Sequence, residues 1–127
     1  MSEGRFRAAV GAVSSLMWTN NEQGQMDGEQ PGWSGFTGQS PEEYRGYGWA
    51  KAVHPDDAQP TVDAWNKAVA AKRMFEFEHR VRRRDGEWRL CSLRAVPLLD
   101  EAGQIREWVG VHTDITERKQ EIGRAHV

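Results

Sequence analysis

The second half of the chain alternates hydrophobic and polar residues with a period of two, which is typical of half-buried β-strands. Residues 75–82 show the alternation most clearly, with Phe, Phe, His and Val on one side and Glu, Glu, Arg and Arg on the other. An Asp-Gly pair at 85–86 indicates a hairpin. Residues 88–98 and 105–113 follow as two further strand-like segments. The pattern predicts a three-stranded antiparallel meander.

The first half of the chain predicts a helix and a pair of strands. Apolar residues recur at helical spacing over residues 6–13, which indicates an amphipathic helix. Residues 16–19 form a short apolar run before a turn, and residues 25–30 are expected to return as a weak second strand.

Two further helices carry start signals. Ser40 is followed by Pro at the first helical position and by Glu three residues after the cap. A longer helix is expected after His54, which is interpreted as a turn-and-cap residue, with Asp56 or Asp57 accepting backbone N–H bonds at its start. Helices and an antiparallel sheet in this order define an α+β domain.

The composition fits one small soluble domain. The 127 residues carry 17 Lys and Arg against 19 Asp and Glu, a net charge of −2, which argues against a polybasic surface for nucleic acid or membranes. Cys91 is the single cysteine, so no internal disulfide and a reducing compartment are expected. No apolar run approaches the roughly 20 residues of a membrane span, and the start lacks a signal-peptide core. We therefore expect a cytoplasmic protein without a membrane span.

Six tryptophans are scattered along the chain. They stand at positions 18, 33, 49, 65, 88 and 108. The first interpretation is that each element contributes one ring to a shared core. The second is that several of them line a pocket for a flat organic molecule.

Five motifs carry a resemblance to a known family. They are Trp-Ser-Gly-Phe-Thr-Gly at 33–38, the helix cap at 40–44, Val-His-Pro-Asp-Asp at 53–57, Phe-Glu-His-Arg-Val at 77–81, and Trp-Val-Gly-Val at 108–111 leading into Asp-Ile-Thr-Glu-Arg at 114–118. Over about residues 5–120 the chain resembles a Per-Arnt-Sim (PAS) sensory domain of the subgroup common in bacterial signalling proteins.

The resemblance implies a five-stranded antiparallel sheet with spatial order 2-1-5-4-3 and short helices on one face. It divides the chain into an N-terminal helix (1–15), a PAS core (16–115) and the start of a signalling linker (116–121). Residues 122–127 match a common translation of a sequencing-adaptor end, so we expect them to be a non-native tail of a metagenomic reading frame. Residues 28–32 depart from the family, whose members usually carry an aromatic residue and Asn there.

The sequence lacks the residues by which two classes of relatives hold their cofactors. Flavin-binding light-oxygen-voltage relatives carry a reactive Cys on a short helix, whereas residues 47–51 contain none, which argues against a flavin photoadduct. Haem-binding relatives place a His on the long helix, and residues 58–71 contain none. Cys91 has no Cys partner for a metal site. The cofactor, if there is one, stays unknown.

The interior face of the meander depends on the length of the loop near residues 85–87. An odd loop places the odd-numbered residues 89–95 inside, whereas a two-residue turn places the even-numbered residues 90–96 inside. The odd loop is favoured because it agrees with relatives. The resemblance then implies a ligand-binding set of Thr19, Trp33, Phe36, Trp49, Phe77, His79, Cys91, Leu93, Trp108 and His112.

His112 stands where flavin-binding relatives keep a ligand-bonding Gln. It is therefore interpreted either as a ligand contact or as a core histidine bonded to a hydroxyl or backbone group. Cys91 is expected to be its cross-strand neighbour, about 5 Å away at Cβ. His79 is expected to lie too far from His112, since one strand separates them and two strand spacings are roughly 10 Å.

A second apolar face of the sheet is expected to point away from the cavity. Because such a face is rarely left exposed to water, we expect it to form a homodimer contact together with the N-terminal helix. Its members are Leu16, Trp18, Leu90, Val109 and Val111.

In relatives the signal leaves through the end of the last strand, here Asp114, Ile115 and Thr116. The output domain is typically a histidine kinase of a two-component system or a cyclic-dinucleotide enzyme, and it is absent from this chain.

Two functions stay open at this point. One is a sensor that binds a small, planar aromatic molecule and relays its occupancy through the last strand. The other is a ligand-free dimerisation and relay module whose cavity is filled by its own side chains. An enzyme with His79 or His112 as general base lacks a paired carboxylate or nucleophile, so the chain is not expected to be an enzyme.

Overall fold

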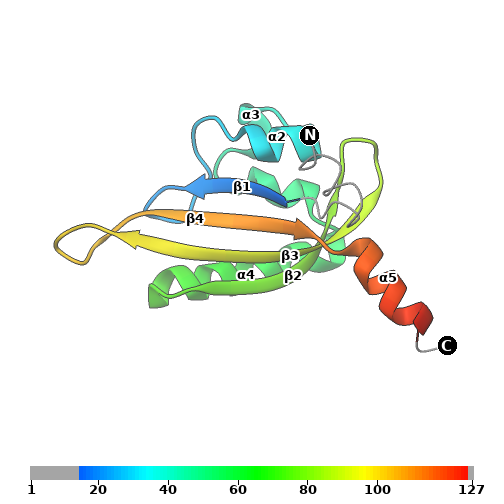
Figure 1. Cartoon of the computed structure of the whole chain (residues 1–127). Coiled ribbons are helices and arrows are strands. Elements are labelled where there is room, and N and C mark those ends of the chain that lie inside the picture. The colour runs from blue at the N-terminus through cyan, green and yellow to red at the C-terminus, as the bar shows by residue number, and fades with distance from the viewer. Residues whose placement is uncertain (1–14, 126–127) are drawn as a thin grey trace, which may run out of the picture.

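The computed structural model describes residues 15–125 (Figure 1). The predicted N-terminal helix over residues 1–15 lies outside this range, apart from Ser15, which begins a strand.

Four antiparallel strands form one sheet. They are β1 (Ser15–Asn20), β2 (Phe75–Arg82), β3 (Trp88–Leu99) and β4 (Ile105–Asp114), in the order β1-β4-β3-β2. The predicted meander is confirmed in β2, β3 and β4. The first strand pairs with the last, so β1 forms one edge of the sheet and β2 forms the other (Figure 1).

The expected five-stranded order 2-1-5-4-3 is wrong, because residues 25–30 do not form a strand. Only Met26 bridges, to Asn20 on one side and to Gly46 on the other. Gly28 adopts a left-handed φ of 69°, which breaks extended pairing. The side chain of Gln30 takes over part of the missing ladder, since its Oε1 accepts the Thr19 backbone N–H at 2.9 Å.

The helices lie between β1 and β2 in the chain, and one more follows β4. They are α2 (Pro31–Thr37), α3 (Pro41–Tyr44), the 3-10 helix η1 (Gly48–Ala52), α4 (Pro55–Ala71) and α5 (Thr116–Ala125). Helix α2 packs against β1, α4 packs against β2, and α5 extends away from the sheet at the end of β4 (Figure 1).

Both predicted helix starts and the interpretation of His54 as a cap are confirmed, whereas the expected capping by Asp56 or Asp57 is wrong. Ser40 and Glu43 form a full capping box at α3. At α4 the cap is His54, whose Nδ1 accepts the Asp56 N–H at 3.1 Å. Asp57 does not cap the helix, because its carboxylate is held by the Arg80 guanidinium and backbone N–H at 2.8–2.9 Å.

The hairpin between β2 and β3 has an odd loop, as favoured. Arg82 pairs with Trp88, which leaves the five residues 83–87 in the loop. Cys91, Leu93 and Ala95 are consequently buried on the same face as His79.

The prediction that Trp18 points away from the interior is wrong. Trp18 is 5% exposed and belongs to the core, and Leu16 on the same strand packs partly against it. The reason is the register: Trp18 pairs with Gly110, whose missing side chain leaves room for the indole. A Cβ on Gly110 would stand 2.1 Å from Cζ2 of that ring. Val111 does face outward, beside the exposed Met17.

Tryptophans build much of the core. Trp65 meets the Trp108 ring edge-on with centroids 4.9 Å apart, and it meets Trp18 edge-on at 6.0 Å. Trp33 is also almost completely buried, whereas Trp88 is 39% exposed and packs on His54. The first interpretation of the tryptophans, a shared core, therefore holds for most of them.

Candidate functional site

A chain of four hydrogen bonds crosses the core from β1 to α4. The Trp18 indole Nε1 donates to His112 Nδ1 at 2.7 Å. His112 Nε2 meets His79 Nε2 at 2.9 Å, and His79 Nδ1 meets Thr61 Oγ1 at 3.0 Å. The Thr61 hydroxyl then donates to the Asp57 carbonyl at 2.7 Å. We call Trp18, His112, His79 and Thr61 the core polar chain.

The tautomers of the two histidines follow from this network. An indole N–H can only donate, so His112 Nδ1 is an acceptor and its proton sits on Nε2. His79 Nε2 must then accept that proton, which places the His79 proton on Nδ1, facing Thr61. Each nitrogen and hydroxyl thus has a partner of the right kind, with both rings neutral.

Two predictions about these histidines are wrong. His79 and His112 touch although β3 lies between their strands, because strand spacing separates backbones while both rings reach over the intervening strand; their centroids are 5.0 Å apart. Cys91 is not the neighbour of His112: it pairs with Asp114 on β4, and His112 pairs with Leu93.

Burial keeps both rings neutral. His79 is 1% exposed, and desolvation lowers its pKa to about 4, against a weaker opposite effect of Asp57. Burial also lowers the pKa of His112 well below its ordinary value, and the neighbouring His79 adds to this. The interpretation of His112 as a core histidine satisfied by a hydroxyl or backbone group is corrected in detail, since its partners are an indole and an imidazole.

A small enclosed space lies beside the core polar chain. Its volume is about 20 Å³, which is room for about one water molecule. Its walls are Trp18, Asn20, Met26, Trp33, Trp49, Thr61, Trp65, Phe75, His79, Leu93 and His112. We call this space the core cavity.

Two residues that line the core cavity carry a buried polar atom with no hydrogen-bond partner within residues 15–125. They are Asn20 with Oδ1, an acceptor, and Trp49 with Nε1, a donor. Buried polar groups are normally paired, so these two atoms are exceptions, while the accessible wall of the cavity is apolar.

The core polar chain does not suit a metal ion. A metal on His112 Nε2 would require the ring proton on Nδ1, where it would face the Trp18 N–H. The part of the chain that the structure describes also contains no group of three His, Cys, Asp or Glu side chains that fits a metal. Burial, followed by the charge of Asp114, raises the pKa of the Cys91 thiol to about 12, so Cys91 stays protonated.

The family model for the PAS fold matches residues 30–112. The chain is a PAS domain.

Two curated relatives are much longer than this PAS domain. It is 32% identical over 118 residues to an uncharacterized protein of Sinorhizobium fredii, y4lL, covering 93% of this chain and 14% of that protein. It is 33% identical over 67 residues to a peroxide stress-activated histidine kinase of Schizosaccharomyces pombe, covering 53% of this chain and 4% of the kinase.

Solved structures share the fold. The N-terminal domain of a diguanylate cyclase with PAS/PAC sensor from Marinobacter aquaeolei has a TM-score of 0.69 at 20% identity, covering 84% of this chain and 99% of that one. A sensory box histidine kinase/response regulator from Burkholderia thailandensis has a TM-score of 0.63 at 27% identity, covering 96% and 92%. These neighbours are sensor proteins, and the PAS domain is their sensory module.

The PAS domain brings half of the predicted ligand-binding set to the core cavity. Trp33, Trp49, His79, Leu93 and His112 line it. Phe36, Phe77, Cys91 and Trp108 contribute to the core without lining the cavity, and Thr19 is bonded to Gln30 at the sheet edge. As ligand contacts, all ten stay predictions.

The sequence interpretation missed Thr61, which joins α4 to the core polar chain. Thr61, Trp65 and Ala68 are all buried at helical spacing on α4. A polar residue in an apolar stripe was the signal that could have identified it.

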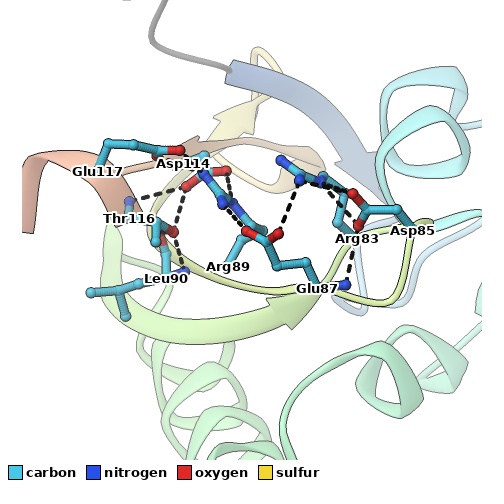
Figure 2. Close-up of polar contacts among 8 residues, drawn as sticks. All are labelled: Arg83, Asp85, Glu87, Arg89, Leu90, Asp114, Thr116 and Glu117. Carbon is cyan, nitrogen blue, oxygen red and sulfur yellow. Dashed lines mark hydrogen bonds and ion pairs between the residues drawn. The ribbon is translucent and has the colours of Figure 1, made fainter. Parts of the chain in front are cut away.

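A second polar cluster joins the end of β4 to α5 in this PAS domain (Figure 2). The buried Arg89 guanidinium donates to Asp114 at 2.7 Å and also pairs with Glu87 and Glu117. Thr116 donates to Asp114 and accepts the Leu90 backbone N–H at 2.8 Å. We call Glu87, Arg89, Asp114, Thr116 and Glu117 the exit cluster.

Charges in the exit cluster stabilise one another. Hydrogen bonds with Glu117 raise the Arg89 pKa further above its ordinary value, and those from Arg89 lower the pKa of Glu117. Burial alone would raise the pKa of Asp114, but hydrogen bonds from Arg89 and Thr116 outweigh it, so that pKa is lowered. The start of α5 is therefore fixed to β3 and β4 by ion pairs.

Proposed function

We propose that this PAS domain is the sensory relay module of a longer signalling protein, and that its interior is filled by its own side chains. The observation that supports this best is the size of the core cavity, about 20 Å³. Small-molecule pockets usually measure about 300–1,000 Å³. Of the two functions left open by the sequence, the geometry favours the ligand-free module.

The relay runs from β4 into α5 through Asp114, Ile115 and Thr116. Ile115 is buried, and its N–H donates to the Leu90 carbonyl at 2.8 Å. With Arg89 bound to Asp114, a shift of β4 relative to β3 changes the position of the first turn of α5. The exit cluster is thus placed to turn a change in the sheet into a movement of α5.

Native mass spectrometry of the whole chain, purified without denaturation, tests the filled interior. The expected result is a mass that equals the sequence, with no additional organic component, and no thermal stabilisation by a panel of planar aromatic compounds. A bound molecule that is lost on unfolding would contradict the filled interior.

Ligand binding is the second candidate. Asn20 Oδ1 and Trp49 Nε1 favour it, because neither has a hydrogen-bond partner among the described residues. A planar aromatic ligand would stack on the tryptophans and use these two atoms. It would also require side chains to move, because the present space is far too small. The same mass measurement decides between the candidates.

The outer face of the sheet is proposed to form a homodimer. Met17, Val96 and Val111 are exposed there, with 61% of the Met17 surface accessible. Light scattering at tens of micromolar is expected to give twice the chain mass, and Val111→Lys is expected to give the monomer. A monomeric wild type would contradict the dimer.

The complete protein is proposed to carry an enzymatic output domain, either a histidine kinase or a cyclic-dinucleotide enzyme. The support is that neighbours of the same fold come from proteins named for these two outputs. The chain itself is proposed to have no catalytic role and to lie in the cytoplasm. None of the described helices has the length and apolar character needed to cross a membrane.

A further inference from the structure

The core polar chain has only one possible direction. Trp18 can only donate, and each following bond from His112 to His79 and Thr61 is forced by it, as far as the Asp57 carbonyl. We propose that the two histidines form a proton-sensitive joint: one added proton breaks the His79–His112 contact if it is on His79, and the Trp18–His112 contact if it is on His112.

An added proton finds no free acceptor atom within the core polar chain. On His79 it would occupy Nε2 and face the Nε2–H of His112 across a contact of 2.9 Å. On His112 it would occupy Nδ1 and face the Trp18 N–H across 2.7 Å. Either site sets two N–H donors against each other, so one contact of the chain must break.

The carboxylates around the joint are already paired with arginines. From α4, Asp57 raises the His79 pKa only weakly, and its carboxylate is bound by Arg80. From β4, Asp114 lies in the same row as His79 and Cys91, and it is bound by Arg89. From β3, Cys91 lies opposite His79 in register and stays a neutral thiol. From α2, Trp33 covers His112 with ring centroids 5.2 Å apart. Burial and the neighbouring ring lower the pKa values of both histidines, consistent with this geometry.

Opening the joint changes which elements the core polar chain ties together. A proton on His79 breaks its contact with His112, so β4 loses its side-chain tie to β2 and α4. A proton on His112 breaks its contact with Trp18, so β4 loses its side-chain tie to β1. The core cavity, of about 20 Å³, borders both rings.

Side-chain ¹⁵N NMR of the whole chain tests the direction of the core polar chain. At pH 7.5 we expect a bare Nδ1 and a protonated Nε2 on His112, and the opposite arrangement on His79. The reverse arrangement on either ring would overturn the proposal.

A titration from pH 7.5 to 4 then tests the joint. The Trp18 indole N–H is expected to change its shift and exchange faster in the step in which the first histidine gains its proton, before the backbone signals of the strands lose their dispersion. Protonation with an unchanged Trp18 signal would overturn the joint. A single global unfolding step without an earlier local change would do so as well.

Trp18→Phe is the matched variant, because it removes the donor that fixes the direction. His112 Nδ1 is then free to carry a proton while Nε2 still donates to His79. We expect the first protonation step to move up by about one pH unit. An unchanged midpoint in a folded variant would overturn the proposal. None of these measurements depends on the proposed function.

Discussion

The Nε2 atoms of His79 and His112 lie 2.9 Å apart, although β3 separates their strands. The contact forms above the strand between them, so it joins the β2 and β4 sides of the sheet through side chains alone. Because Trp18 and Thr61 bind the outer nitrogens, this contact links side chains from four elements, β1, β4, β2 and α4.

Stability is predicted to fall in mild acid because of His79. Its pKa is lowered from 6.5 to about 4, so the unfolded chain binds more protons below pH 6.5 and stability is lost as the pH falls from about 6.5 to 4. The stability lost over this whole pH range amounts to about 3–4 kcal/mol, since the two pKa values differ by about 2.5 at about 1.4 kcal/mol each.

Urea unfolding between pH 7.5 and 4.5 measures this loss. His79→Gln is expected to make the loss of stability smaller without abolishing it, because the pKa of buried His112 is also lowered, even if the variant is less stable at pH 7.5. A wild-type curve that is flat over this range would contradict the prediction.

Gly110→Ala is predicted to destabilise the domain by about 1–3 kcal/mol. Its methyl group would stand 2.1 Å from the Trp18 ring, so the indole must move and its bond to His112 is lost. Gly35→Ala is the control, since Gly35 lies in helix α2 with no atom near its Cβ position. This change should stabilise by about 0.5–1 kcal/mol. Equal effects of both changes in urea unfolding would show that the close approach is unimportant.

Asp114→Asn is predicted to loosen the start of α5. The change removes the carboxylate that binds Arg89 and Thr116, so the backbone of the first turn should exchange hydrogen about tenfold faster. Hydrogen exchange read by mass spectrometry over residues 115–120 measures this. Glu76→Gln breaks only the exposed pair with Arg94 and should leave that exchange unchanged. Unaltered exchange in Asp114→Asn would argue against the exit cluster as the anchor.

Lys72→Gly is predicted to stabilise the end of α4 by about 0.5–1 kcal/mol. Lys72 has a left-handed φ of 56°, which is unfavourable for a side chain and normal for glycine. Lys67→Gly, at an exposed position inside the same helix, should instead cost about 1 kcal/mol. Thermal unfolding of the two variants should therefore shift in opposite directions, and a shared direction would refute the account of the helix end.

His112→Ala tests the ligand-binding candidate. If a planar aromatic molecule binds through His112, the variant should lose a kilocalorie per mole or more of ligand-induced stabilisation, about 1 kcal/mol for one hydrogen bond. Thermal shift with the compound found by native mass spectrometry measures the loss. Unchanged stabilisation would exclude His112 as a ligand contact.

Local sequence patterns predicted most helices and strands, because these patterns reflect interactions between residues that are close in sequence. The capping box at Ser40 and the alternation over residues 75–82 need only neighbours in sequence. The weak strand at 25–30 failed because its fate depended on Gly28 and on the Gln30 side chain, which competes for the edge of β1.

The sequence by itself determined the family and the meander, since periodicity and motif order are properties of the chain alone. It left the inward face of β3 open between two loop lengths, and the pairing of Arg82 with Trp88 decided it. Only the tertiary structure decided that Trp18 turns inward over Gly110, that His79 reaches His112, and that so little space is left inside. These features depend on side chains from distant elements converging in one volume. Which aromatic rings touch, and how much space stays empty between them, is set only when the sheet and the helices pack together.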